Sequence, residues 1–144
     1  MKKRVRLING KTIFSVVIVA LLIVVTVVLI NMNGKVTYND DYFKSDDSKI
    51  VSTFVSDVEE FSANQIVPVK SYMVYYYSGN KINNVKVFYK FENFEQTEEA
   101  NKYLDVGSLE WADAKEVNGE YLIVQMNKSE YDELTTEIVR GFGD

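Results

Sequence analysis

The longest hydrophobic stretch of the chain covers residues 13–30 and contains no charged side chain. An α-helix of 18 residues is about 27 Å long, close to the ~30 Å hydrocarbon core of a bilayer. Lipid offers the backbone no hydrogen-bond partner, so this segment has to be helical despite its many β-branched residues. The pattern therefore predicts a transmembrane helix over residues 13–31.

Basic residues precede this hydrophobic run and decide its predicted orientation. The positive-inside tendency keeps such residues in the cytoplasm, which predicts a cytoplasmic tail at residues 1–12 and an extracytoplasmic location for the rest of the chain. The run is longer than the ~7–15 apolar residues of a cleaved signal peptide, and no small-x-small cleavage pattern follows it, so a retained signal anchor is favoured. The basic residues are Lys2, Lys3, Arg4, Arg6 and Lys11.

Polar, turn-forming residues follow and predict a tether and loop over residues 32–46, with a short extended piece at residues 35–38. Apolar residues then recur at helical spacing behind Asp46 and Asp47, which suit the positive end of a helix. This pattern predicts a helix over residues 47–62. Its apolar stripe consists of Ile50, Phe54, Val58 and Phe61.

β-branched and aromatic residues dominate residues 67–77 and 84–91, which predicts two strands joined through a longer loop at residues 78–83. Asn93 and nearby glutamates predict a second helix over residues 94–105. An Asn-Gly pair at residues 118–119 predicts a hairpin between residues 114–117 and 121–126. A capping box formed by Ser129 and Asp132 predicts a last helix, with apolar residues at Tyr131, Leu134, Ile138 and Phe142.

In order, these elements predict an α+β fold with a ferredoxin-like βαββαβ order and an extra C-terminal helix. We expect a small two-layer sandwich that occupies residues 47–144. Many unrelated proteins share this order of elements, so it indicates little about activity.

Side chains alternate between the two faces of a strand, so the predicted central hairpin has two different faces. One is apolar and suited to lie under the helices, with Val67, Val69, Met73, Tyr75, Tyr77, Val85, Val87, Tyr89 and Phe91. The other, called here the tyrosine–lysine face, carries Lys70, Tyr72, Val74, Tyr76, Lys86, Phe88 and Lys90.

The tyrosine–lysine face allows two interpretations. As a partner-binding surface, it would use Lys70, Tyr72, Tyr76, Lys86, Phe88 and Lys90, since aromatic rings supply contact area and lysines supply polar recognition. In the structural alternative, the lysine stems cover the rings, or the last helix lies over them with Leu134, Ile138 and Phe142.

The composition narrows the chemistry. The chain has no Cys and no His, which excludes thiolate and imidazole catalysis and the usual zinc ligands. No glycine-rich phosphate loop is present, and no spacing singles out a pair of carboxylates. We therefore predict no catalytic residue, no metal and no cofactor.

The net charge bears on the class of partner. Residues 12–144 carry eleven basic residues against 21 acidic ones, a formal charge of −10, which argues against a nucleic-acid partner. The absence of Cys favours a bacterial envelope, since small eukaryotic secreted domains more often use disulfides. Trp111 is interpreted as a plug between the second helix and the following hairpin, with an anchor for a partner as the alternative.

Together these features favour a single-pass membrane protein whose extracytoplasmic domain is a non-catalytic binding module of the cell envelope. We expect its partner to be another envelope protein. One alternative is an extracytoplasmic small-ligand sensor or solute-binding module, and another is a small hydrolase that uses carboxylates.

Overall fold

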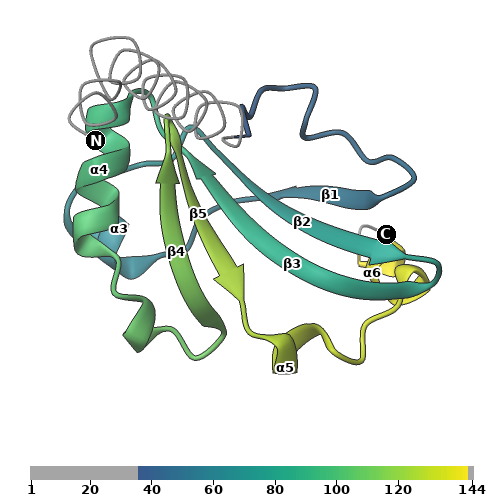
Figure 1. Ribbon diagram of the computed structural model, residues 1–144. Helices are drawn as coiled ribbons and strands as arrows, with labels where there is room; N and C mark the ends of the chain where they lie inside the picture. The colour runs from purple at the N-terminus through teal and green to yellow at the C-terminus, as the bar shows by residue number, and fades with distance from the viewer. Residues whose placement is uncertain (1–35, 143–144) are drawn as a thin grey trace, which may run out of the picture. The chain divides into compact units, whose positions relative to one another are not determined.

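The computed structural model describes residues 36–142 (Figure 1). The predicted cytoplasmic tail and the predicted transmembrane helix over residues 13–31 lie outside this range. Within residues 36–142, no helix has the length and apolar character that crossing a membrane requires. A compact unit spans Tyr38–Asp144.

This unit is α+β, as the sequence predicts, and is built on an antiparallel sheet of five strands in the order β1-β2-β3-β5-β4. Short helices connect and follow the strands (Figure 1). The strands are β1 (Lys49–Phe54), β2 (Lys70–Ser78), β3 (Lys81–Lys90), β4 (Ala112–Asn118) and β5 (Tyr121–Met126). The helices are α3 (Glu59–Ala63), α4 (Phe94–Tyr103), the 3-10 turn η1 (Val106–Ser108), α5 (Lys128–Tyr131) and α6 (Thr136–Gly141).

The ferredoxin-like order is wrong for this sheet. A split βαβ unit needs another strand between the two strands that a helix connects. Here β1 pairs directly with β2, from Lys49 opposite Tyr76 to Phe54 opposite Ser71. The expected first strand at residues 35–38 has no regular secondary structure at residues 36–38, and β1 comes instead from the region predicted as helix.

The predicted helix over residues 47–62 is therefore also wrong, apart from its last turn in α3. Ile50, Phe54 and Val58 are spaced by four, and that spacing puts residues on one face of a strand as well as of a helix. The β-branched residues between them favour the strand. Asp46 accepts hydrogen bonds from the backbone N–H groups of Ser48 and Lys49, so it caps the turn before β1 and not a helix.

The central and C-terminal hairpins form at the predicted places, although β2 begins at Lys70 and not at residue 67, and the central turn is tighter than expected. β2 and β3 are joined through Gly79 and Asn80, because Gly79 adopts a φ of 63° and closes a shorter turn than the expected loop over residues 78–83. Gly119 adopts a φ of 60° in the Asn-Gly turn between β4 and β5. The register places Tyr72 opposite Phe88, so the two expected faces are present within the strands. Val67 and Val69 were wrongly assigned to the apolar face: β2 begins only at Lys70, and both residues are exposed.

The helix after β3 also forms as predicted. The Asn93 side chain accepts a hydrogen bond from the backbone N–H of Gln96 and caps α4. The last helix is divided in two: α5 has no side-chain cap from Ser129, and Thr135 caps α6 by accepting from the N–H of Ile138. Because the helix is interrupted between Tyr131 and Thr136, the Leu134 carbonyl is free to accept a hydrogen bond from the N–H of Ile82 in β3.

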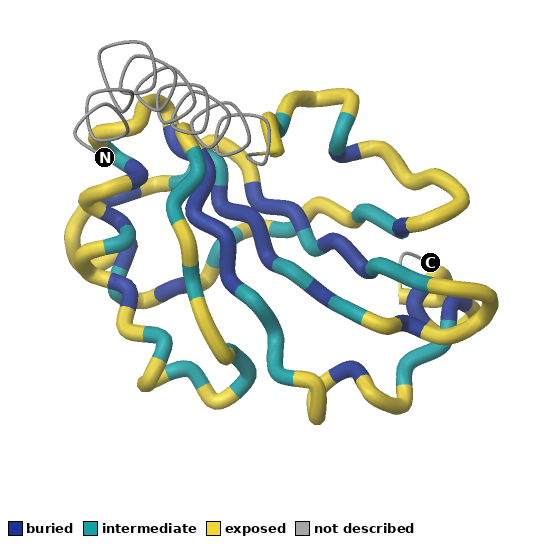
Figure 2. Tube along the Cα trace, in the orientation of Figure 1, coloured by how far each residue is buried: buried dark blue, intermediate teal, exposed yellow. Residues whose placement is uncertain are grey.

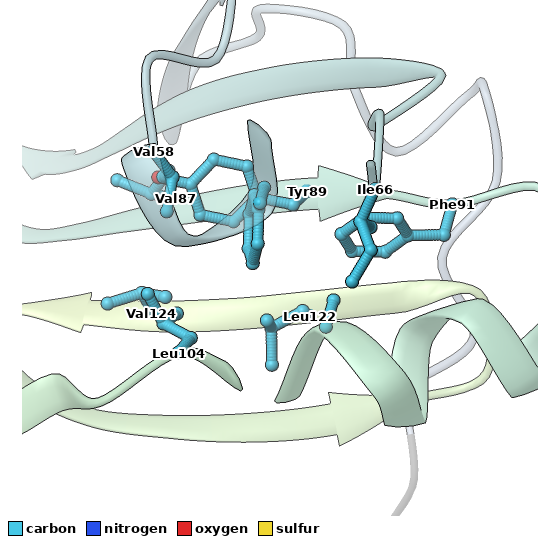
Figure 3. Close-up of a cluster of buried hydrophobic side chains, with 10 residues drawn as sticks. Val58, Ile66, Val87, Tyr89, Phe91, Leu104, Leu122 and Val124 are labelled. Carbon is cyan, nitrogen blue, oxygen red and sulfur yellow. The ribbon is translucent and has the colours of Figure 1, made fainter. Parts of the chain in front are cut away.

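The core on the apolar face of the sheet has two parts. Figure 1 shows α3 and α4 towards one end of the sheet and α6 at the other. The first part packs α3 and α4 against β3 and β5, as Figure 3 shows, around Val58, Phe61, Ile66, Val87, Tyr89, Phe91, Ala100, Leu104, Leu122 and Val124. The second part packs α5 and α6 against β2 and β3 and contains Tyr75, Ile82, Val85, Tyr131 and Val139.

Candidate functional site

The aromatic residues of the tyrosine–lysine face are buried. Tyr72 is 4% exposed and Phe88 is 0% exposed, and Tyr76 is half-buried. The lysines lie at the margins of this face, where Lys70 is exposed and Lys86 and Lys90 are partly exposed (Figure 2 shows the burial along the chain). The structure therefore brings the six predicted residues onto one face, where Tyr72 and Phe88 are closed to a partner and the lysines and part of Tyr76 remain accessible.

The cover over this face comes from residues 38–43, here called the covering segment. The Phe43 ring stacks on the Tyr72 ring with centroids 3.9 Å apart and an interplanar angle of 8°. The Tyr38 ring meets the Phe88 ring edge-on at 5.0 Å. The Tyr42 and Tyr76 hydroxyl groups form a hydrogen bond with each other. These contacts make residues 38–43 part of the domain, although the sequence predicts that they belong to a tether.

The structural alternative for this face is favoured, but with a different cover from the expected one. The last helix does not lie over it: Val139 and Leu134 pack on the opposite face, and Ile138 and Phe142 are exposed. The ammonium groups of Lys70 and Lys90 lie 5.8 Å and 6.0 Å from the ring centroids of Tyr72 and Tyr121, so these lysines partly cover the rings. The signal in the sequence was the three aromatic residues within the polar stretch at 38–43.

Burial at the covering segment raises the pKa of three tyrosines, one in the segment and two on the sheet beneath it. Burial, followed by the nearby Tyr42 and Glu116, raises the pKa of Tyr38 to about 12. Burial, followed by Tyr72, Asp40 and Glu120, raises the pKa of Tyr121 to about 12. Burial and the hydrogen bond with Tyr42 also raise the pKa of Tyr76.

We expect alkaline pH to weaken the domain through these phenols. Below pH 10 they are protonated in both states, so they do not change stability with pH. Between pH 10 and about 12 the unfolded chain loses protons that Tyr38 and Tyr121 retain when folded, so the free energy of unfolding falls over this window. Phenolate absorbance and urea midpoints measured across the window test this, and Tyr38→Phe should lose less stability. An equal loss in that variant contradicts the prediction.

The apolar face of the sheet has an open groove of about 350 Å³, here called the Trp111 groove. The groove is lined by Phe54, Asp57, Met73, Val87, Tyr89, Trp111 and Met126. Of these, Phe54 lies at the end of β1, Met73 in β2, and Met126 at the end of β5. The lining residues are apolar or aromatic except for Asp57.

Local hydrogen bonds hold Trp111 at this groove. Its carbonyl accepts a hydrogen bond of 2.8 Å from the backbone N–H of Asn127, and the Asn127 side chain donates to the Glu110 carbonyl at 2.7 Å. The ring packs against the buried cluster around Val87 and Leu122, so it is part core, as predicted, and part groove wall. Burial, and then the charge on Asp57, raise the pKa of Tyr89, which keeps its hydroxyl neutral.

The carboxylates do not point to a metal site or to a catalytic pair in this groove. Of the residues that the structure describes, Asp57 is the one acidic residue that lines it. Among residues 36–142, no cluster of three or more Asp and Glu residues has the geometry to hold a metal ion. A separate polar cavity of about 250 Å³ is lined by Glu92 and Glu99, and both side chains are exposed.

Comparisons of this chain with models of protein families, with curated proteins and with solved structures found no match. What the groove binds is therefore argued from its own residues. The groove combines aromatic and thioether contacts with one carboxylate, and this combination is the observation that bears on function.

Proposed function

We propose that this chain is a membrane-tethered, non-catalytic binding module of the cell envelope. In this proposal residues 13–31 anchor it in the plasma membrane, and the extracytoplasmic domain binds another envelope protein. The Trp111 groove is the observation that carries the proposal, since apolar concave sites with few polar groups are typical of ligand and side-chain recognition.

The negative charge around the groove favours a positively charged group in the partner. Asp57 lines the groove, and Glu110 and Asp113, both exposed, flank Trp111 in the sequence. A lysine or arginine side chain would place its aliphatic stem on the apolar lining and its charge near these carboxylates. The indole face adds an attraction for a cation. The partner segment we propose therefore carries a basic residue beside an apolar one.

The methionines support recognition of a flexible segment. Met73 and Met126 lie on different strands and both line the groove. Unbranched thioether side chains adjust their shape to irregular groups and make favourable contacts with aromatic rings. A groove with this lining adapts to a peptide side chain more readily than a rigid aliphatic wall would.

Trp111 allows a direct test because it is the only tryptophan of the chain. Its fluorescence should change on titration of the full chain with phenethylammonium, a small aromatic cation. The matched anion 3-phenylpropionate should bind about 2–5-fold more weakly, the difference that one partly exposed ion pair provides. Asp57→Asn should remove most of this preference, because Asp57 supplies the charge. Equal affinity for both probes, or no fluorescence change, contradicts the proposed site.

The partner is tested in intact cells with a photo-cross-linking amino acid in place of Glu110, the exposed residue before Trp111, so that Asp57 is retained. We expect one discrete cross-linked product, and we expect phenethylammonium to compete with its formation. Glu137 in α6 is the matched control position, since it is also acidic and exposed but lies outside the groove lining. Binding of the probe without any cross-linked protein would favour the small-ligand sensor over the protein-binding module.

A further inference from the structure

The two edge strands of the sheet differ in how they are protected against pairing with another strand. The order β1-β2-β3-β5-β4 makes β1 and β4 the edges. β4 contains Asp113, Lys115 and Glu116 and has a register irregularity between Ala112 and Ala114. Charged residues and bulges are the usual means by which proteins prevent edge pairing. The β4 edge is therefore protected.

The first half of β1 is protected in another way. The Ser48 carbonyl accepts a hydrogen bond from the N–H of Tyr77 in β2, so alternate backbone groups of β1 point away from the sheet, starting with Lys49. Lys49 donates its backbone N–H to Asp46 at 3.0 Å, and Val51 donates its N–H to the Ser45 hydroxyl at 2.9 Å. The turn before β1 thus occupies the outward N–H groups of this half.

The second half of β1 is open. Thr53 lies in β1, and by the same alternation its backbone groups point outward; Val55 follows directly after the end of β1 at Phe54, and continued alternation would point its groups the same way. Within residues 36–142, the backbone groups of neither residue have a hydrogen-bond partner. Val55 is 91% exposed. No charged residue lies between Lys49 and Asp57. A row of free donors and acceptors flanked by uncharged, β-branched side chains is a template for strand addition.

We propose that this open edge of β1 pairs with the same edge of a second copy of the chain, antiparallel, with Phe54 on the two-fold axis. In this register Thr53 and Val55 of one copy exchange backbone hydrogen bonds with Val55 and Thr53 of the other, which satisfies the free groups of these two residues. The bonds from Lys49 and Val51 to the preceding turn remain intact.

The side chains favour a second copy over an unrelated strand. Phe54 lies opposite Phe54, Thr53 opposite Val55, and Ser52 opposite Ser56. Each cross-strand pair joins residues of the same kind, and such aromatic, β-branched and hydroxyl pairs are favourable in antiparallel sheets. A two-fold interface requires one patch that is complementary to itself, and the uncharged stretch also lets two acidic domains approach without opposing charges.

So short an interface needs a high local concentration. Stable protein interfaces bury about 1,200–2,000 Å² in total, more than a few paired edge residues supply. The proposed membrane anchor confines both copies to one surface and raises their effective concentration. This last step rests on the proposed anchor. The pairing shares Phe54 with the lining of the Trp111 groove, but its hydrogen bonds come from the backbone of Thr53 and Val55. Disulfide yield reports the pairing and probe fluorescence reports the groove, so the failure of either proposal is measured separately.

Disulfide cross-linking tests both the pairing and its register, because the chain has no native Cys. Two forms of the full chain, one with Ser52→Cys and the other with Ser56→Cys, carry different tags and are expressed together. Native membranes are then mildly oxidised. The proposed register places position 52 of one copy directly opposite position 56 of the other, within the ~4.4–6.8 Å Cα separation of disulfides. Two identical positions are offset by four residues, about 13 Å, and are too distant.

We therefore expect the mixed dimer to exceed both single-variant dimers. Ala114→Cys on the β4 edge is the matched control and should give no dimer above background. Adding Thr53→Lys to both forms places a charge on the open edge and should lower the mixed dimer by about tenfold. Trp111 fluorescence checks that this variant is folded. A mixed dimer no more abundant than the control, equal amounts of all three dimers, or a disulfide to a different protein overturns the proposal.

Discussion

Replacing Tyr72, Tyr76 and Phe88 together by serine is expected to unfold the domain. Phe88 is completely buried and Tyr72 nearly so, and both pack against Phe43. Truncating one buried phenylalanine costs about 3–5 kcal/mol. A domain of this size is stable by only about 5–15 kcal/mol, so loss of three packed rings should exceed that margin.

Circular dichroism and Trp111 fluorescence of the full chain in detergent measure the outcome. The control replaces Lys70, Lys86 and Lys90, on the margins of the same face, by serine, and this variant should remain folded. If the three aromatic residues were an open binding surface, their replacement would leave the fold intact and abolish partner binding. A folded aromatic variant would thus restore the first interpretation of this face.

Phe43→Ala is expected to destabilise the domain by about 3–5 kcal/mol, although the residue lies in a segment that the sequence assigns to a tether. Phe43 is 8% exposed and contacts Tyr72, Phe88 and Tyr121 through its ring. The urea midpoint of the full chain should fall accordingly, and phenol titration should show Tyr38 and Tyr121 ionising at lower pH as the covering segment loosens.

Lys44→Ala is the matched control next to the same segment. Lys44 forms an ion pair with Asp41 at 3.0 Å, but both side chains are largely exposed. Exposed pairs of this kind contribute about 0–1 kcal/mol, so the midpoint should hardly move. Similar effects of the two substitutions would mean that residues 38–43 do not pack as a cover.

Sequence periodicity failed at β1 for a specific reason. A four-residue spacing is consistent with period 3.6 and with period 2, and Ile50, Phe54 and Val58 are spaced in this way. Only the pairing of β1 with β2, which satisfies the backbone groups of both strands, decides between the two periods. The same error produced the ferredoxin-like order, since a predicted helix replaced an edge strand.

The elements with local signals were predictable. Asn93 caps α4, and Gly119 supplies the positive φ of the β4–β5 turn, and both effects act within a few residues. The two faces of the β2–β3 hairpin follow from strict alternation and are present. The function was not predictable in the same way, since the membrane anchor and the envelope partner stay predictions. The structure adds the Trp111 groove, of which the sequence indicated only Trp111 itself.

The sequence by itself determined the α+β class, the central hairpin with its two faces, α4 and the tight Asn-Gly turn, because short-range backbone preferences and side-chain periodicity specify each of them. Only the tertiary structure decided which face is closed, that residues 38–43 close it, that β1 is an edge strand, and that Trp111 borders a groove. These features depend on contacts between residues far apart in the chain, and their free energy comes from burying surfaces against one another, which local patterns do not encode.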